Sequence, residues 1–355
     1  MSRARDLGSL INSSAAGKNF VINGGMDIWQ RGTSKLDGAN SYHTADRWLL
    51  SSAPAATFSR QTTNDTTNLP FIQYCMRLQR TAGSTNTNNM NIAQSFESIN
   101  SVPLAGKTVT LSFYARKGAN YSATNSDITA QLFTGTGTDQ NAYTVGYTGS
   151  VAAISRTAVL TTTWQRFIYT ATLAANTNEI GLIFVGTQTG TAGAADFYEI
   201  TGIQLEQGSS ATEFSRAGGD IQGELAKCQR YYETNYPAGI TPGFNMPNAG
   251  LDFASLSLSA KMGVTGTTGS NRSRSEARVF AVQKRSTPSA IYWDWVGNIS
   301  KYSGGNFDGS RSSDNLSVDA FGGFGVSDKS ISFQTVSASS SIVFAGVMWA
   351  ASAEL

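Results

Sequence analysis

Apolar and polar residues alternate along much of the chain, which is the pattern of β-strands that bury one face. The segment Lys107–Arg116 shows the alternation most clearly. Its apolar side carries Val109, Leu111, Phe113 and Ala115, and its other side is mostly hydroxyl residues. Further strands are expected in three segments of the same character: Thr163–Leu173, Glu179–Val185 and Asp196–Leu205.

Connectors rich in Gly, Asn and Thr separate these segments, among them Ala82–Asn89 and Gly135–Thr138. Many short strands with polar turns and no helices between them are typical of an antiparallel β-sandwich or jelly roll. We therefore expect residues 18–216 to form a jelly-roll domain, preceded by a short arm over residues 1–17. The arm has apolar residues at helical spacing, which we interpret as a docking or assembly contact: Leu7, Leu10 and Ile11.

The pattern changes after residue 216. Asp220 is placed to cap a helix, and Pro237 is placed to end it. A narrow apolar seam follows the cap at spacings of four, three and four residues: Ile221, Leu225, Cys228 and Tyr232. The spacing predicts a linker helix of roughly 15 residues within 217–236, whose seam packs against a neighbouring helix of the same chain or of another copy.

Strand-like patterns return over residues 237–355, which predict a second, smaller β-sandwich and a candidate receptor-contact domain. Two glycine-rich stretches, Gly304–Gly309 and Gly322–Gly325, are expected to be turns or bulges. The expected strands are Leu251–Leu258, Ala277–Val282, Ile291–Val296, Ile331–Val336 and Ile342–Ala350.

Composition agrees with an all-β chain. Of 355 residues, 40% are hydrophobic and 14% are charged, against a typical charged fraction of about 25%. The net charge is +2, from 26 basic and 24 acidic side chains, and the densest basic run, Asn271–Arg278, is interrupted by Glu276. Nucleic acid is therefore not an expected partner. No apolar stretch reaches the ~20 residues of a membrane span, so membrane insertion is not expected either.

The chain is poor in catalytic groups. Nucleophilic catalysis by Ser or Cys needs a base that is usually His, and the single histidine, His43, lies in a turn-like stretch. Asp196 and Glu199 are interpreted as salt-bridged or solvated surface acids rather than as calcium ligands. Cys75 and Cys228 are expected to be plain buried thiols. We expect no enzyme activity, no metal site and no cofactor.

Aromatic side chains are the candidate ligand contacts, because rings stack on sugar faces. Trp29, Trp48 and Trp164 are interpreted as core residues. The second aromatic group is the candidate glycan site, in which Trp293 and Trp295 share one side of a strand; filling the core of the second sandwich is the alternative. The candidate residues are Tyr292, Trp293, Trp295 and Tyr302.

Several motifs, in this order, resemble phage tail-fibre and related virion proteins. Asn19–Gly32 and Tyr42–Trp48 are similar to the opening of those proteins, and Glu224–Glu233 and Ala351–Leu355 are similar to their helix and their ending. Three further motifs resemble a jelly-roll carbohydrate-binding module: Leu104–Arg116, Thr163–Phe167 and Ile203–Phe214.

The resemblance implies a bacteriophage virion protein, made in the host cytoplasm, that forms a homotrimeric tail fibre or spike and contacts host surface glycans. It implies as partners other copies of the chain, other virion proteins through the arm, and host surface polysaccharide. The resemblance leaves open whether the jelly roll still binds sugar. The alternatives are a capsid decoration, head fibre or tail connector without host contact and, less favoured, a glycan-degrading enzyme.

Overall fold

The computed structural model describes residues 18–37, 40–52, 56–236, 240–243, 272–293, 303–305, 321–337, 344–346 and 348–355. The chain divides into two compact units, Met1–Cys228 together with Leu355, and Gln229–Glu354. The predicted arm, with Leu7, Leu10 and Ile11, lies outside the described residues.

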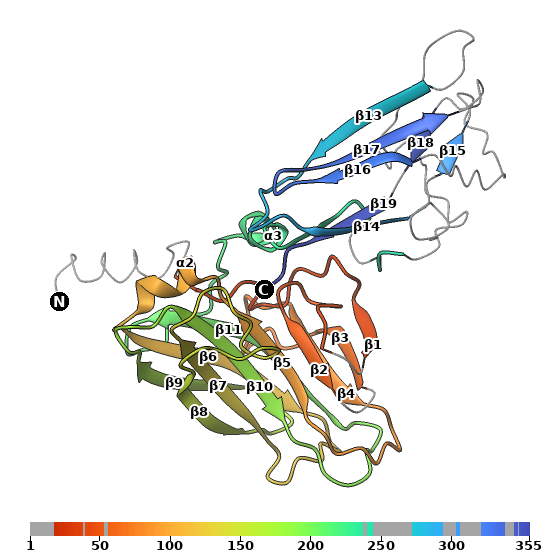
Figure 1. Ribbon diagram of the computed structural model, residues 1–355. Coiled ribbons are helices and arrows are strands. Elements are labelled where there is room, and N and C mark those ends of the chain that lie inside the picture. Colours follow the sequence, from red (N-terminus) through yellow and green to blue (C-terminus); the bar gives the residue numbers. More distant parts are fainter. Residues whose placement is uncertain are drawn as a thin grey trace. The chain divides into compact units, whose positions relative to one another are not determined.

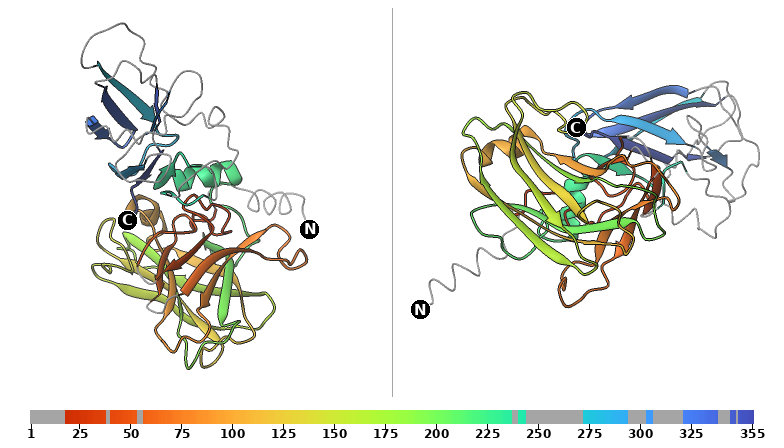
Figure 2. Two further views of the ribbon diagram at one scale, coloured as in Figure 1. Left: turned by 90° about the vertical axis from the view of Figure 1, so that its right-hand side faces the viewer. Right: turned by 90° about the horizontal axis from the view of Figure 1, so that it is seen from below.

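The described strands of the first unit form two antiparallel sheets, which Figures 1 and 2 show as stacked layers. The six-stranded sheet has the order β1 (Ser34–Asp37), β3 (Ala56–Thr62), β4 (Tyr74–Arg80), β11 (Phe197–Gln207), β6 (Thr108–Lys117) and β9 (Gln165–Thr172). The five-stranded sheet has the order β2 (Leu49–Ser52), β5 (Met90–Ser95), β10 (Glu179–Gly186), β7 (Asp127–Gly135) and β8 (Val151–Val159).

The pairing of strands β4 to β11 follows one rule. The first strand of this series pairs with the last, the second with the last but one, and so on inwards: β4 with β11, β5 with β10, β6 with β9 and β7 with β8. Successive pairs alternate between the two sheets. A long antiparallel ladder wound into two sheets in this way is a jelly roll, so the predicted fold class is confirmed.

The core lies between the two sheets and is built from the apolar sides of the alternating strands. Phe113 on β6 is fully buried, and its ring centroid lies 5.3 Å from that of Phe167 on β9 and 4.9 Å from that of Phe184 on β10. Aromatic pairs at such separations add to the free energy gained by burying their area. The side predicted to be apolar in Lys107–Arg116 is therefore the core side.

Tryptophans tie the loops to this core. The indole N–H of Trp48 donates to the carbonyl of Asn23, that of Trp29 to Met26 and that of Trp164 to Thr63. All three rings are buried. The interpretation as core residues is confirmed for Trp29 and Trp48, whereas Trp164 is buried in a separate small cluster with Leu69, Ile72 and Cys75.

Two short helical segments, α2 (Ser98–Ser101) and η1 (Val102–Leu104), join β5 to β6, and α3 (Ile221–Gln229) follows the jelly roll. Asp220 caps α3 as predicted, since its carboxylate accepts a hydrogen bond of 2.7 Å from the backbone N–H of Gly223. The helix ends at Gln229, well before Pro237. The predicted length was wrong because Tyr232–Thr234 forms strand β12 instead.

The buried side chains of α3 are Glu224 and Cys228 rather than the whole predicted seam, and Ile221 is exposed. The Glu224 carboxylate accepts hydrogen bonds from the backbone N–H groups of Asn23 and Gly218. Burial raises the pKa of Glu224 above its usual value, while these two N–H groups act in the opposite direction. The helix is thus anchored to the jelly roll by a buried carboxylate.

The described strands of the second unit are also antiparallel. One sheet has the order β12 (Tyr232–Thr234), β19 (Met348–Ser352) and β14 (Ser289–Trp293). A second has the order β13 (Arg272–Val279), β17 (Ser330–Ser337) and β16 (Phe321–Val326), and a third pairs β15 (Ser303–Gly305) with β18 (Phe344–Gly346). The all-β class is confirmed here too.

Two glycine-rich stretches of the second unit differ from simple turns. The register between β16 and β17 shifts between Phe321 and Gly323, so the expected bulge in Gly322–Gly325 is confirmed. Gly304 and Gly305 belong to β15 rather than to a turn. The expected strand Leu251–Leu258 lies outside the described residues.

The second unit has a small buried centre. Phe280 and Trp349 are buried with ring centroids 5.6 Å apart, and the ammonium of Lys284 lies 4.4 Å from the Phe280 centroid. Lys284 also donates a hydrogen bond of 2.6 Å to Glu233. Burial lowers the pKa of Lys284, and the contact with Glu233 acts against that shift.

Candidate functional site

The outward side of the five-stranded sheet is the candidate site. Because side chains alternate between the two sides of a strand, the register places two rows of residues on this side. The first row is Leu49, Ala93, Ile183, Gln131 and Ser155. The second row is Ser51, Asn91, Val185, Thr129 and Thr157.

Apolar residues lie on this outward side although it faces away from the core. Leu49, Ala93 and Ile183 are buried and form a small hydrophobic cluster of their own. The partly buried side chains that pack against this cluster are Tyr42, Phe133, Tyr143 and Val185. We call the surface made by the two rows and the rings of Tyr42, Phe133 and Tyr143 the aromatic face.

Its three rings come from separate parts of the chain. Phe133 extends from β7, next to Gly181 of β10. Tyr42 belongs to a segment that is bridged to the edge strand β2, since Ser41 and Leu50 exchange backbone hydrogen bonds of 3.0 and 2.7 Å. Tyr143 lies in the connection between β7 and β8.

Asn141 holds the two tyrosines in place. Its side-chain oxygen accepts hydrogen bonds of 2.9 and 3.0 Å from the backbone N–H groups of Tyr143 and Thr144, which is an Asx-type turn. Its side-chain nitrogen donates to the Tyr42 hydroxyl at 3.1 Å. One buried amide therefore sets the positions of both rings.

A chain of hydrogen bonds crosses the aromatic face beneath Tyr143. The side-chain nitrogen of Asn91 donates to the Tyr143 hydroxyl at 2.8 Å, and that hydroxyl donates to the Ser51 hydroxyl oxygen, also at 2.8 Å. Asn91 is only 5% exposed. In this network the side-chain nitrogen of Asn91 is the atom that contacts Tyr143.

Gly181 allows the connection between β7 and β8 to lie against the sheet. A Cβ atom at this position would come within 2.6 Å of the Ala142 Cβ and 2.7 Å of the Tyr147 hydroxyl. Tyr147 is buried here, and burial raises the pKa of its phenol. The glycine therefore permits the loop that carries Tyr143 to approach the sheet.

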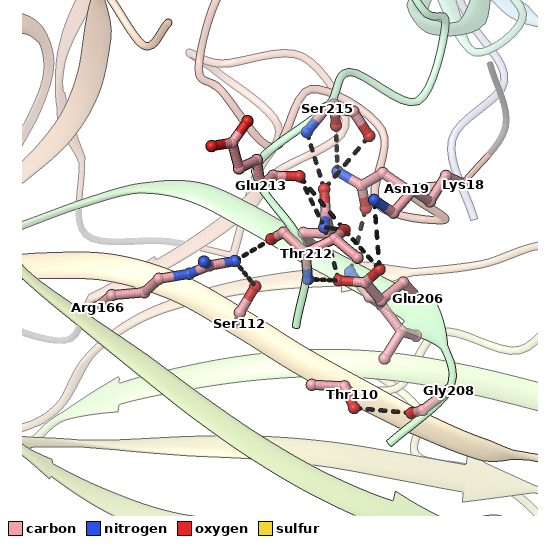
Figure 3. A network of polar contacts seen from close by, with 12 residues as sticks. Lys18, Asn19, Thr110, Ser112, Arg166, Glu206, Gly208, Thr212, Glu213 and Ser215 are labelled. Atoms are coloured by element: carbon pink, nitrogen blue, oxygen red, sulfur yellow. Dashed lines mark hydrogen bonds and ion pairs between the residues drawn. The ribbon is translucent and has the colours of Figure 1, made fainter. Parts of the chain in front are cut away.

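Buried carboxylates lie on the outward side of the other sheet. Glu206 is the centre of the network in Figure 3, where its oxygens accept hydrogen bonds from the Thr212 backbone N–H (2.9 Å), the Thr212 hydroxyl (2.7 Å) and the Gln204 amide (2.7 Å). Lys18 lies 3.7 Å from the same carboxylate. The contacts with Thr212 and Lys18 join the end of β11 to the segment that follows it and to the start of the jelly roll, and the contact with Gln204 lies within β11.

Glu199 and Asp196 are paired with arginines. Glu199 receives Arg77 at 2.6 Å and Arg116 at 2.5 Å, and Asp196 receives Arg80 at 2.9 Å. Both carboxylates are fully buried. The salt-bridged interpretation of these acids is confirmed, but they are not on the surface. Within the described residues, no group of three or more His, Cys, Asp or Glu side chains is placed to hold a metal ion.

The residues proposed from sequence as a glycan site are not gathered by the described part of the second unit. Tyr292 and Trp293 lie on β14, and Trp295 and Tyr302 lie outside the described residues. Among the predicted subunit contacts, Leu225 is partly buried on α3 and Tyr232 is buried on β12 rather than on the helix. Cys75 and Cys228 are buried thiols, as expected.

Sequence reasoning missed the aromatic face, although two signals point to it. In β7 the outward positions are Thr129, Gln131 and then Phe133, so an aromatic ring stands where a polar residue is usual. In β10 the run Ile180–Val185 is apolar on both sides apart from a glycine, which indicates that both sides of that strand are covered. Asn141 and Tyr143 carry no such signal.

No protein-family model matches the sequence, and no curated protein matches it. Among solved structures, one of CBM4 matches with a TM-score of 0.34 at 18% identity, over 52% of this chain and 98% of that one. The enzymatically active domain of tailspike protein 4 from bacteriophage CBA120 matches with a TM-score of 0.34 at 13% identity, over 54% of this chain and 21% of that one. TmCBM61 in complex with β-1,4-galactotriose matches with a TM-score of 0.30 at 13% identity, over 54% of this chain and 99% of that one. With TM-scores this low, the jelly-roll assignment rests on the strand order of the chain itself.

In the part of the chain that the structure describes, no helix is long and apolar enough to cross a lipid bilayer.

Proposed function

We propose that the chain is a non-enzymatic structural protein of a bacteriophage virion that binds glycans of the host surface. Its place in the virion is a homotrimeric tail fibre or spike, and the binding site is the aromatic face of the jelly roll. The motif resemblance over Asn19–Gly32, Tyr42–Trp48 and Glu224–Glu233 supports the virion role.

The observation that carries the glycan site is the set of half-buried rings on a sheet surface that faces away from the core. Tyr42, Phe133 and Tyr143 offer ring area that is held in place by packing and by Asn141. Aromatic area combined with a few fixed amides and hydroxyls is what sugar recognition uses. Gln131, Thr129 and Thr157 on the same face supply hydrogen-bonding groups at partly or fully exposed positions.

A non-enzymatic role is supported by the state of the buried acids. Glu199, Asp196 and Glu206 are each occupied by arginines or by backbone and side-chain donors. A glycosidase needs one carboxyl that is free to give up a proton and a second that is free to attack or to activate water. Carboxylates held in this way are suited to stabilising the fold.

Direct binding to polysaccharides tests the glycan site. Purified full-length chain should be retarded by at least one polysaccharide in affinity electrophoresis, and Phe133→Ala should weaken that binding about tenfold, which corresponds to about 1.4 kcal/mol. Phe71→Ala is the matched control, because Phe71 is 67% exposed and lies outside the aromatic face. Equal loss in both variants would contradict this assignment. Competition with phage adsorption then separates host contact from decoration.

The proposed trimeric state is tested by measuring the mass of the protein in solution. Light scattering of the full-length chain should give a mass three times the 37.6 kDa of one copy. A trimer suits a binding protein because three linked weak sites gain avidity that one site lacks. A monomer at all concentrations up to the micromolar range would count against a self-sufficient fibre subunit.

A further inference from the structure

The aromatic face is free of charge over both of its residue rows. None of the ten side chains in the two rows is ionisable. Asp127 and Glu179 stand only at the strand ends, and Glu179 is fully buried. A glycan that carries carboxylates or sulfates is normally met by Arg or Lys. The rows offer no such partner.

Within the part of the chain that the structure describes, the cation that lies over one of the rings is already paired. Arg31 lies over the Tyr42 ring at 5.9 Å, and its guanidinium is 3.6 Å from the Asp46 carboxylate. Arg31 is also buried. Arg156 of β8 alternates to the other side of the sheet from Ser155 and Thr157, and its guanidinium donates to the carbonyl of Ser155. Charge therefore selects against anionic sugars at this surface.

Asn91 has a polar atom that the fold does not use. Among the described residues, its side-chain oxygen is buried and has no hydrogen-bond partner, while its nitrogen is held by Tyr143. A buried acceptor without a donor costs free energy, and such groups in native proteins call for an explanation. Replacement of Asn91 by an apolar residue would remove this cost, so the amide is expected to serve something other than stability.

Tyr143 is hydrogen-bonded to the same amide. Its hydroxyl makes two side-chain hydrogen bonds, to Asn91 and Ser51, both on the aromatic face. Its loop contains the 75% exposed Val145 and two glycines with positive φ, Gly146 and Gly149. A ligand hydroxyl that takes the place of the Tyr143 hydroxyl meets the Asn91 amide.

We propose that the ligand of the aromatic face is an uncharged glycan, one of whose hydroxyls donates to the side-chain oxygen of Asn91 once Tyr143 has turned aside. This inference rests on the proposed function. It adds the chemical class of the ligand and the residue that recognises one of its hydroxyls. The rings supply contact area, and Asn91 supplies the directional hydrogen bond.

The ligand class is tested by affinity electrophoresis of the full-length chain in two sets of gels. One set contains the uncharged polymers xylan, galactan, β-glucan, mannan and dextran, and the other contains polygalacturonate, alginate and hyaluronate. Retardation by uncharged polymers alone supports the inference. Retardation by anionic polymers alone overturns it and leaves glycan binding intact, whereas no retardation in any gel overturns the proposed function as well.

The role of Asn91 is tested on the polymer that binds best. Asn91→Leu should weaken binding at least tenfold and leave the thermal midpoint unchanged or higher, because the unpaired acceptor is gone. Gln79→Leu is the control, since Gln79 lies on β4 of the other sheet and its amide donates to the carbonyl of Ala194. If Asn91→Leu lowers the thermal midpoint and leaves the affinity unchanged, Asn91 has a structural role and the inference is wrong.

Tyr143→Phe gives a second readout that does not depend on how Asn91→Leu folds. The variant keeps the ring and loses the hydroxyl that holds it over the amide, so its affinity should equal or exceed that of the wild type. A tenfold loss would mean that the hydroxyl itself contacts the sugar, which contradicts the turning-aside step.

Discussion

Replacing Arg80 by methionine is expected to lower the free energy of unfolding of the first unit by about 3–5 kcal/mol. Arg80 and Asp196 are both fully buried and lie 2.9 Å apart. The guanidinium also donates to a set of loop carbonyls and one hydroxyl, namely those of Ser84, Asn86, Thr189, Gly190 and Ser122. Methionine fills much of the volume but leaves the Asp196 charge and the carbonyls without their donor.

The measurement is differential scanning calorimetry of the full-length chain, with hydrogen exchange on peptides of the first unit to assign the transition. Arg156→Met is the matched control, because Arg156 is exposed and donates a hydrogen bond to the carbonyl of its neighbour Ser155. The control should change stability by less than about 0.5 kcal/mol. Similar midpoints for the two variants would show that the buried pair does not hold these loops.

The second large effect is expected for Glu206→Ala, at about 3 kcal/mol, since removing one partner of a buried, charged network leaves the remaining groups unsatisfied. The Gln204 amide, the Thr212 backbone N–H and the Lys18 ammonium would each lose the carboxylate (Figure 3). The segment after β11 should open locally before the sheets separate.

Limited proteolysis checks this local opening. Cleavage between residues 208 and 216 should become much faster in Glu206→Ala, while the hydrogen exchange of β6 and β11 changes less. Glu213→Ala is the control, because Glu213 takes part in this network through its backbone carbonyl. Uniform weakening of the whole unit in both variants would contradict a local clamp.

The strands of the jelly roll could be predicted because each one carries its own alternation. Val109, Leu111 and Phe113 face the core as their spacing indicates. The order of the strands could not be predicted in the same way, because pairing between β4 and β11 depends on contacts across more than a hundred residues. Local patterns indicate a strand but not its neighbours.

The end of α3 shows the same limit. Tyr232 continues the helical spacing of Ile221, Leu225 and Cys228. The spacing therefore predicts a helix that continues as far as Pro237. In the structure Tyr232 pairs with Ser352 of β19. A strand partner far along the chain therefore overrides the local helical spacing.

The candidate site was the least predictable part. Phe133 and the apolar run of β10 carried a local signal that sequence reasoning did not use, whereas Asn91 and Tyr143 look like ordinary polar and loop residues. Their meaning depends on one hydrogen bond between them and on an oxygen that the fold leaves unpaired. Such a relation exists only in three dimensions.

The ladder that joins β4 to β11 also constrains synthesis. During translation, β4 has left the ribosome long before its partner β11 is made, so the six-stranded sheet cannot close until residues near Gln207 emerge. Pairings this distant are slow to form and leave strand edges exposed meanwhile. We therefore expect the nascent first unit to depend on chaperones until its last strand has been made.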